Sequence, residues 1–170
     1  MPTNIEIKAR VRDWDQTRRA AEALADRPLE IIDQVDTFFA CSNGRLKLRE
    51  FSPTRGELIA YDREDITGAK ASRYLITFTN EPEVLRNVLL RALGASGIVK
   101  KRRYLYLCGP TRIHLDDVEN LGKFLELEVV LATGEDEASG ETIARELMQK
   151  LGVEPEDLLA GAYVDLIAAA

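Results

Sequence analysis

Acidic, basic and apolar side chains alternate in a short segment close to the N-terminus. In residues 4–11, NIEIKARV, Glu6 and Lys8 share the polar face of an expected strand, while Ile5 and Ile7 lie on the opposite face. A carboxylate is a good ligand for a divalent cation, and an ammonium group is a good partner for phosphate. A strand whose polar face simply meets water would show the same pattern. From this segment alone, both interpretations stay open.

Two further segments carry charges of a single sign on one face. In residues 44–50, GRLKLRE, that face is basic, with Arg45, Lys47 and Arg49. In residues 124–131, FLELEVVL, the corresponding face is acidic where it is polar, with Glu126 and Glu128. Like charges stacked along one strand cost energy unless a counter-charge lies between them. The segregation therefore favours a fold in which basic and acidic strands face one another.

Composition restricts the class of protein. The chain has 170 residues, of which 45% are hydrophobic and 31% charged, as expected for one globular domain over residues 1–170. The formal net charge of -6 argues against broad nucleic-acid binding, because a surface that tracks phosphates makes a domain basic. Cys41 and Cys108 have no second pair to complete a zinc site, so we expect reduced thiols.

No segment predicts export or a membrane span. The apolar runs are too short to cross a bilayer. Charged residues occupy the N-terminal segment, where a secretory signal needs an apolar stretch. We therefore expect a cytoplasmic protein without a membrane partner.

Eight segments have the composition or alternation typical of strands, and several of the turns between them are short. The expected strands are residues 4–11, 33–40, 44–51, 56–65, 72–79, 97–108, 111–117 and 124–132. Helices are expected over residues 13–26, 80–94 and 139–152, capped by Asp13, Asn80 and Ser139, with a shorter one near residues 155–168. Short links imply antiparallel neighbours, and eight antiparallel strands can close into a barrel that holds one small ligand. The expected fold is α+β, an eight-stranded antiparallel β-barrel or tunnel with helices packed outside.

The lining of such a tunnel has a chemical consequence. If the charged faces point inward, the apolar faces remain outside for the three longer helices to cover. The lumen then holds many bases and a few carboxylates, which are expensive to bury without compensation. A phosphate chain satisfies the bases, and magnesium takes one or two carboxylates together with substrate oxygens. In this interpretation Glu6 is a metal ligand and Lys8 a phosphate ligand.

Segments along the chain match a known family. They are NIEIKARV, QVDTFF, GRLKLRE, LIAYDRE, VKKRRYLYL, TRIHLDDVENLGKFLELEVVL and AYVDLI, and together they extend over nearly the whole chain. The sequence resembles the CYTH superfamily, the triphosphate tunnel metalloenzymes, and in particular its class IV adenylate cyclase-like branch. The resemblance implies an eight-stranded antiparallel tunnel that binds a triphosphate with Mg2+ or Mn2+. Family members include adenylate cyclases, thiamine triphosphatases, inorganic triphosphatases and RNA triphosphatases.

The resemblance also implies roles for individual side chains. The implied metal ligands are Glu6, Asp116, Glu126 and Glu128. The implied triphosphate-binding residues are Lys8, Lys47, Arg49, Arg63, Lys101, Arg103 and Arg112. Glu6, Lys8, Glu126 and Glu128 are the expected catalytic residues. A shift of one residue would put Lys100 and Arg102 in the tunnel in place of Lys101 and Arg103, so this register stays open.

Two positions in the matching segments need separate interpretation. Asn4 stands where the family signature ExExK has its first Glu. An amide oxygen can ligate a hard cation or hold a metal-bound water, but it brings no charge and cannot act as a general base. The remaining acids suffice for one metal ion. For His114, the one histidine of the chain, we expect a packing or hydrogen-bonding role.

The implied activity is a metal-dependent reaction on a triphosphate, most like the conversion of ATP to cyclic AMP and pyrophosphate. The first alternative is hydrolysis of tripolyphosphate or of an organic triphosphate such as thiamine triphosphate. A further alternative is a sensor that binds a nucleotide or polyphosphate without turnover. Cyclisation and hydrolysis can use the same binding groups, because they differ in which phosphorus meets an aligned nucleophile.

Overall fold

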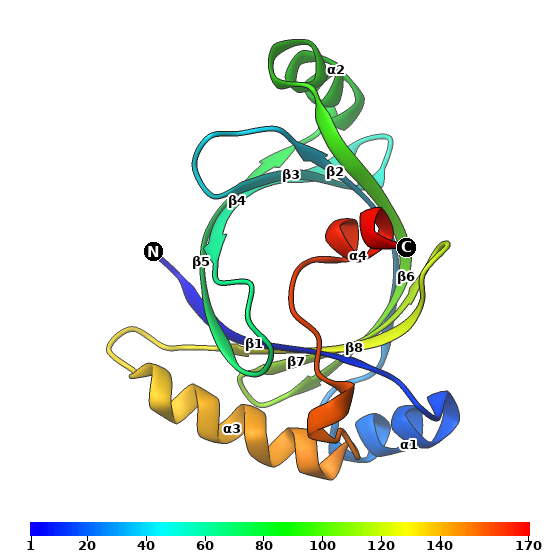
Figure 1. Cartoon of the computed structure of the whole chain (residues 1–170), viewed down its shortest axis with the longest axis vertical. Helices are drawn as coiled ribbons and strands as arrows, with labels where there is room; N and C mark the ends of the chain where they lie inside the picture. The colour runs from blue at the N-terminus through cyan, green and yellow to red at the C-terminus, as the bar shows by residue number, and fades with distance from the viewer.

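Eight antiparallel strands close into a barrel in the computed structural model, which describes residues 1–170 (Figure 1). The strands are β1 (Thr3–Arg10), β2 (Glu30–Phe39), β3 (Arg45–Ser52), β4 (Arg55–Arg63), β5 (Lys70–Thr79), β6 (Ala95–Cys108), β7 (Thr111–Val118) and β8 (Gly122–Val130). Their order around the barrel is β1-β5-β4-β3-β2-β6-β7-β8, and pairing of β1 with β8 closes the ring. The predicted antiparallel barrel is confirmed.

Four α-helices accompany the barrel. They are α1 (Trp14–Leu24), α2 (Pro82–Leu93), α3 (Glu137–Lys150) and α4 (Tyr163–Ala169), with a short 3-10 helix η1 at Pro155–Asp157. In Figure 1, α1 and α3 lie outside the wall made by β1, β7 and β8, and α2 lies beyond the opposite side of the ring. None of the helices combines the length and the apolar sequence that a bilayer span requires.

Two of the predicted helix caps are wrong. The N-cap of α2 is Glu81 instead of Asn80, and it makes no side-chain capping bond, because Pro82 in the first turn starts the helix. The N-cap of α3 is Asp136, whose carboxylate accepts a hydrogen bond from the Ser139 backbone N–H. This bond satisfies a free donor of the first turn, so α3 begins before the predicted Ser139 cap.

The outer faces of β1, β7 and β8 form the main apolar core. Ile5, Leu125 and Leu127 are fully buried there and belong to one cluster with Ala144 and Leu147 of α3. Complete burial of an aliphatic side chain contributes about 1.5–3 kcal/mol, so this wall is a major source of stability. Apolar residues of these strands therefore point outward under a helix, as predicted for a barrel with inward charges.

Helix α2 does not cover an apolar wall, contrary to expectation. Only Pro82 is buried, and Val84 and Val88 are each 57% exposed. The helix joins β5 to β6 and contacts β2, β3 and β4 near their ends. Its attachment includes an ion pair between Arg86 and Glu50 of β3, at 2.7 Å. Because the helix lies beside the strand ends, it does not bury its apolar stripe.

The C-terminal segment fills one end of the barrel, a role that the predicted short helix did not include. Leu159 donates its backbone N–H to the carbonyl oxygen of Lys8 at 2.9 Å, which leads the chain across the barrel end. There, Ala162, Tyr163 and Val164 join barrel residues Phe38, Ile59, Tyr61, Val99, Val118 and Phe124 in a second buried apolar cluster, here called the plug. Figure 1 shows α4 within the outline of the ring. The tunnel is therefore filled at the plug and open at its other end.

Docking of α4 depends on a close approach at Gly97. A Cβ atom at this position would overlap the Cγ2 atom of Val164, which is 8% exposed. We therefore expect Gly97→Ala to lower the free energy of unfolding by about 1–3 kcal/mol through overpacking. Adding Val164→Ala removes the overlapping methyl groups, so the double variant should lose less stability than the two single losses together. Chemical denaturation of the four proteins checks this, and simple additivity would contradict the proposed contact.

Candidate functional site

Inward-facing side chains of the strands line a cavity of about 810 Å³ inside the barrel. The lining includes these residues predicted from the sequence: Glu6, Lys8, Lys47, Arg49, Arg63, Lys101, Arg103, Arg112, Glu126 and Glu128. Asp116 lies behind the lining and is fully buried. The charged faces of the strands therefore meet inside the barrel, because the apolar faces are buried on the outside.

The structure decides the register of β6. The side chains of Lys101 and Arg103 are 3% and 4% exposed and face the interior. Arg102 is 56% exposed and pairs with Asp33 on the outside. Pairing of β6 with both β2 and β7 sets this orientation, so Lys100 is also on the outside. Of the two registers left open by the sequence, Lys101 and Arg103 face the tunnel.

Lys8 connects the acidic strand to the plug. Its Nζ atom lies 3.2 Å from Oε1 of Glu126, its in-register partner on β8. The same ammonium donates a hydrogen bond to the carbonyl oxygen of Gly161 at 3.0 Å and lies 4.1 Å from the centroid of the Tyr163 ring. Burial lowers the pKa of Lys8, while the charge of Glu126 acts in the opposite direction. This cation is thus held in place at the filled end of the tunnel.

Asp116 binds protein groups in this structure. Its two carboxylate oxygens accept hydrogen bonds from Arg103 at 2.8 and 2.7 Å, and the Tyr163 hydroxyl donates to it at 2.9 Å. Although burial raises its pKa, Arg103 and Lys101 together hold that pKa well below the usual range. Arg103 also donates to Glu126 at 3.0 Å. Asp116 therefore positions Arg103, and it lies outside the group of side chains that could share a cation.

Glu6 faces a base as well as an acid. It pairs in register with Glu128 across β1 and β8, and its Oε2 lies 3.0 Å from Nη1 of Arg63. Burial raises the pKa of Glu6 and the nearby Glu128 carboxylate adds to this, while Arg63 opposes the shift. A cation at Glu128 would relieve the repulsion between the two carboxylates. The position is compatible with the predicted metal role.

Asp36 is a buried acid that the sequence prediction missed. Arg49 donates two hydrogen bonds to its carboxylate, both at 2.8 Å, and Lys47 lies 3.4 Å away. Despite burial, Arg49 and Lys47 hold the pKa of Asp36 far below its usual range. In the segment QVDTFF, Asp36 shares the inward face with Gln34 and Phe38. That alternation was a usable signal, because it places an acid opposite the basic face of β3.

Basic groups outnumber acidic ones in the tunnel and behind its lining. Away from the mouth, the acids are Glu6, Asp36, Asp116, Glu126 and Glu128, and the bases are Lys8, Lys47, Arg49, Arg63, Lys70, Lys101 and Arg103. Further lining residues, exposed or half-buried, are Glu30, Asp33, Arg55, Glu57 and Arg112. Burial, with repulsion from Arg103, lowers the pKa of Lys101 to about 7. Burial, with repulsion from Arg63, lowers the pKa of Lys70 to about 8. A bound polyanion would favour the charged form of both lysines, so the interior is suited to bind a polyanion.

Glu126, Glu128 and His114 could share a metal ion. One ligand atom from each lies within 4.8 Å of the other two. Burial, followed by repulsion from Arg103, lowers the pKa of His114, which favours the neutral imidazole that a metal needs. The Nδ1 atom of His114 has no hydrogen-bond partner. Two carboxylates and an unpartnered nitrogen fit a divalent cation, and they include two of the four predicted ligands.

The family model for the CYTH domain matches residues 2–163. The chain belongs to the CYTH domain family. A comparison with curated protein sequences found no match. The family assignment agrees with the closed eight-stranded barrel and with the inward charges, and it confirms the resemblance seen in the sequence.

Solved structures resemble this CYTH chain over nearly its full length. The PH1012 protein from Pyrococcus horikoshii OT3 is 26% identical, with 96% of this chain and 99% of that chain covered and a TM-score of 0.85. A candidate adenylate cyclase from Vibrio parahaemolyticus is 20% identical, with 98% of each chain covered and a TM-score of 0.77. A candidate adenylyl cyclase from Hippeastrum, described as having a dominant triphosphatase activity, is 15% identical, covers 98% and 95% and has a TM-score of 0.66. The last two establish a shared fold.

The open end of the CYTH tunnel has an apolar lining. Side chains that line it there are Ile32, Phe51, Tyr74, Ile76, Leu105 and Leu107, together with the charged Arg55, Glu57 and Arg112. Ile76 is 42% exposed, so this apolar surface meets solvent. The tunnel thus changes from a basic interior at the plug to a mixed apolar and charged mouth.

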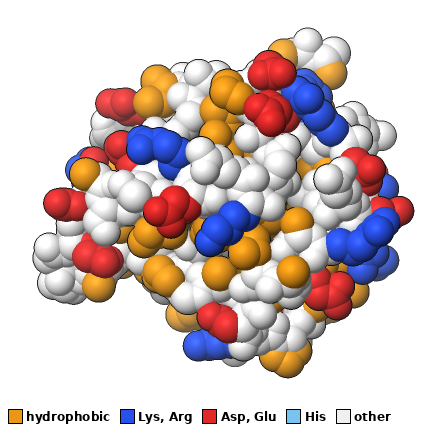
Figure 2. All heavy atoms as spheres, turned by 90° about the horizontal axis from the view of Figure 1, so that it is seen from below, with side chains coloured by type: hydrophobic (Ala, Val, Ile, Leu, Met, Phe, Trp, Pro, Cys, Tyr) orange, Lys and Arg blue, Asp and Glu red, His pale blue; other side chains and the backbone are white.

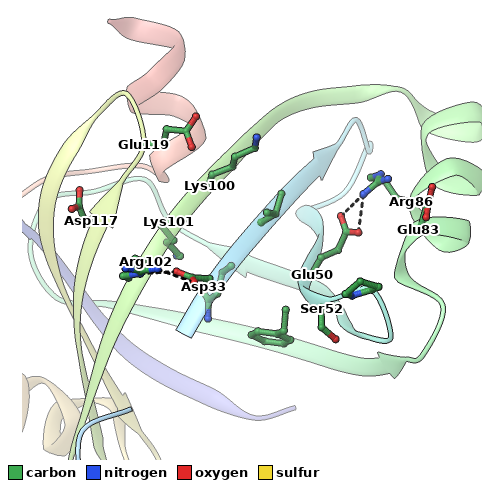
Figure 3. Close-up of a pocket in the computed structure, with 14 residues that line it drawn as sticks. Asp33, Glu50, Ser52, Glu83, Arg86, Lys100, Lys101, Arg102, Asp117 and Glu119 are labelled. Carbon is green, nitrogen blue, oxygen red and sulfur yellow. Dashed lines mark hydrogen bonds and ion pairs between the residues drawn. The ribbon is translucent and has the colours of Figure 1, made fainter. Parts of the chain in front are cut away.

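A second hollow, of about 710 Å³, lies outside the barrel between β2, β3, β6 and α2 (Figure 3). Its arginines are already paired, Arg102 with Asp33 and Arg86 with Glu50. On the face shown in Figure 2, side chains of both signs are scattered among apolar and neutral ones. The tunnel differs in that its charged groups are buried and its bases are in excess, so the tunnel is the candidate site.

The lowered pKa of Lys101 predicts a pH dependence of polyanion binding. Without a ligand, the Lys101 side chain is charged below about pH 7. A bound phosphate chain raises its pKa, so binding above pH 7 takes up a proton. The contribution of Lys101 to affinity is complete well below pH 7 and declines as the pH rises from about 7 to the raised pKa of the complex. Calorimetry with tripolyphosphate at pH 8, in two buffers of different ionisation enthalpy, measures the uptake.

The matched variants for this test are Lys101→Arg and Lys100→Arg. Arginine stays charged over this range, so Lys101→Arg should reduce the proton uptake, leaving the part due to Lys70. Lys100→Arg changes the neighbouring side chain on the outer face and should leave the uptake as in the wild type. Equal uptake by all three proteins would show that Lys101 is already charged at pH 8.

Proposed function

We propose that this CYTH protein is a metal-dependent enzyme that processes a triphosphate bound inside the tunnel. The observation that carries the proposal is the excess of buried bases converging beside Glu126 and Glu128. Placing several cations in a barrel interior costs free energy, which a chain of phosphates offsets through charge-assisted hydrogen bonds. The shape of the site also suits a chain molecule, because the basic end is filled by the plug and the other end is open.

The role of each residue in the tunnel depends on its position. Lys8 and Lys101, near the plug, bind the phosphates that reach furthest into the barrel. Arg103 is held rigidly by Asp116, so it can stabilise negative charge that develops on phosphate oxygens without first being reordered. Glu126, Glu128 and Glu6 would hold a Mg2+ or Mn2+ ion, which would supply Lewis-acid polarisation of the phosphate oxygens.

Cyclisation of ATP is the first candidate reaction, as in the class IV adenylate cyclase-like branch that the sequence resembles. The ribose 3'-hydroxyl would attack the α-phosphorus, and pyrophosphate would leave. The second candidate is hydrolysis of the terminal phosphoryl group of an inorganic or organic triphosphate. It is supported by the Hippeastrum neighbour, which is described as having a dominant triphosphatase activity. The apolar mouth offers contacts to an organic group, which supports ATP or thiamine triphosphate over tripolyphosphate.

Product analysis tests the proposal. The protein is incubated with Mg2+ or Mn2+ and, separately, with ATP, tripolyphosphate and thiamine triphosphate, and the products are separated by chromatography. Cyclic AMP with pyrophosphate would identify a cyclase, and released orthophosphate would identify a triphosphatase. Binding without any product would contradict the enzymatic proposal and indicate a sensor.

Glu128→Gln gives a sharper test of the metal-dependent chemistry. The amide keeps the size of the side chain but removes the charge that attracts the cation, so turnover should fall by about 100-fold. Glu119→Gln is the matched control, because Glu119 is exposed on the outside of the barrel and should show wild-type turnover. Circular dichroism checks that both variants fold. Unchanged turnover in Glu128→Gln would remove this residue from the site.

A further inference from the structure

His114 is a buried side chain whose Nδ1 atom makes no hydrogen bond. Its side chain is 4% exposed, and it projects from β7 into the tunnel. The Oε2 atom of Glu126 lies 3.6 Å from Nδ1, which is beyond hydrogen-bond distance. Burial of a polar atom without a hydrogen bond costs free energy, so such atoms in folded proteins usually have a role. Here the free nitrogen lies in the same cavity as two carboxylates.

The surroundings of His114 favour a cation as the missing partner. Glu126 is its in-register neighbour across β7 and β8, and Glu128 follows two residues along the same face. Oε1 of Glu126 is engaged by Lys8 at 3.2 Å and its Oε2 by Arg103 at 3.0 Å, whereas the closest base to Glu128 is Arg112 at 3.7 Å. Glu128 therefore has capacity for a further ligand, and the donor atoms of all three residues lie within 4.8 Å of one another. A hydrogen-bond donor could satisfy Nδ1 alone, but a cation satisfies both Nδ1 and the Glu128 carboxylate.

We propose that His114 is a metal ligand, and that the site consequently binds a first-row transition-metal ion such as Mn2+ more tightly than Mg2+. Magnesium prefers an all-oxygen shell and keeps much of its water, whereas imidazole nitrogen favours transition-metal ions. Affinity for a mixed nitrogen and oxygen site rises along the first-row series from Mn2+. The preference over Mg2+ should therefore be smaller for Mn2+ than for the later ions of the series. This inference rests on the proposed function for the identity of the bound group, and it specifies which cation the enzyme uses.

The test exploits the presence of a single histidine in the chain. Mn2+ is added to untagged protein, and electron spin-echo envelope modulation records coupling of the metal to nitrogen-14. Because no other imidazole is present, an imidazole nitrogen signal can come only from His114. Titrations followed by electron paramagnetic resonance give the Mn2+ affinity, and competition gives the Mg2+ affinity. We expect a nitrogen signal and Mn2+ binding at least about tenfold tighter than Mg2+ binding.

His114→Asn is the matched variant, because an amide of similar reach replaces nitrogen by oxygen. We expect loss of the nitrogen signal and a drop in Mn2+ affinity of about 10-fold or more, with a smaller drop for Mg2+. Mn2+ bound without a nitrogen signal, equal losses for both metals, or no Mn2+ binding would each overturn the inference. The wild-type spectrum remains decisive even if the variant folds poorly.

Failure of the inference and failure of the proposed function are distinguishable. A nitrogen signal without turnover of any triphosphate would support the His114 site and contradict the enzymatic proposal. Turnover with Mg2+, together with Mn2+ bound through oxygen alone, would support the enzyme and overturn the role of His114. The metal measurements need no substrate, so the two results are obtained independently.

Discussion

Basic side chains directed into the barrel need counter-charge, and the rest of the structure is arranged around that need. Arg103 obtains it from Asp116 and Glu126, and Arg49 obtains it from Asp36. Removing one partner of a buried ion pair costs about 3–5 kcal/mol, because the other charge is left unpaired. With the charges inside, the apolar residues of the strands point outward, which is why α3 covers β1 and β8. Stability and the candidate site thus depend on the same inward faces.

The barrel and most of the tunnel lining were predictable because strand periodicity is local. Alternation in GRLKLRE and FLELEVVL placed Lys47 and Glu126 on inward faces once the strands closed. The register of Lys101 was not local, since it depends on pairing with β2 and β7. The bond from Tyr163 to Asp116 joins residues 47 positions apart, and no spacing in the sequence indicates it. For α2, periodicity predicted a helix but not which surface its apolar residues would meet.

Membership of the CYTH family and the geometry of the tunnel address different questions. The family and the fold account for why one molecule combines a basic interior with an acidic strand. The particular contacts of this chain then distinguish residues that hold other residues from those free to bind something else. Asp36 and Asp116 belong to the first kind, because their oxygens are engaged by arginines. Glu128 and His114 have fewer protein partners, and they are where binding of a small ligand would change the structure least.

The plug also determines by which end a molecule can enter and leave the barrel. Because the buried cluster around Tyr163 fills one end, a molecule that enters phosphates first has to leave by the way it came. The part that penetrates deepest departs last, after whatever occupied the mouth has gone. Under the proposed function, a fragment retained among the inner lysines would block the next molecule and would act as a competitive inhibitor. A blind-ended passage of this kind imposes an order of release that an open-ended one does not.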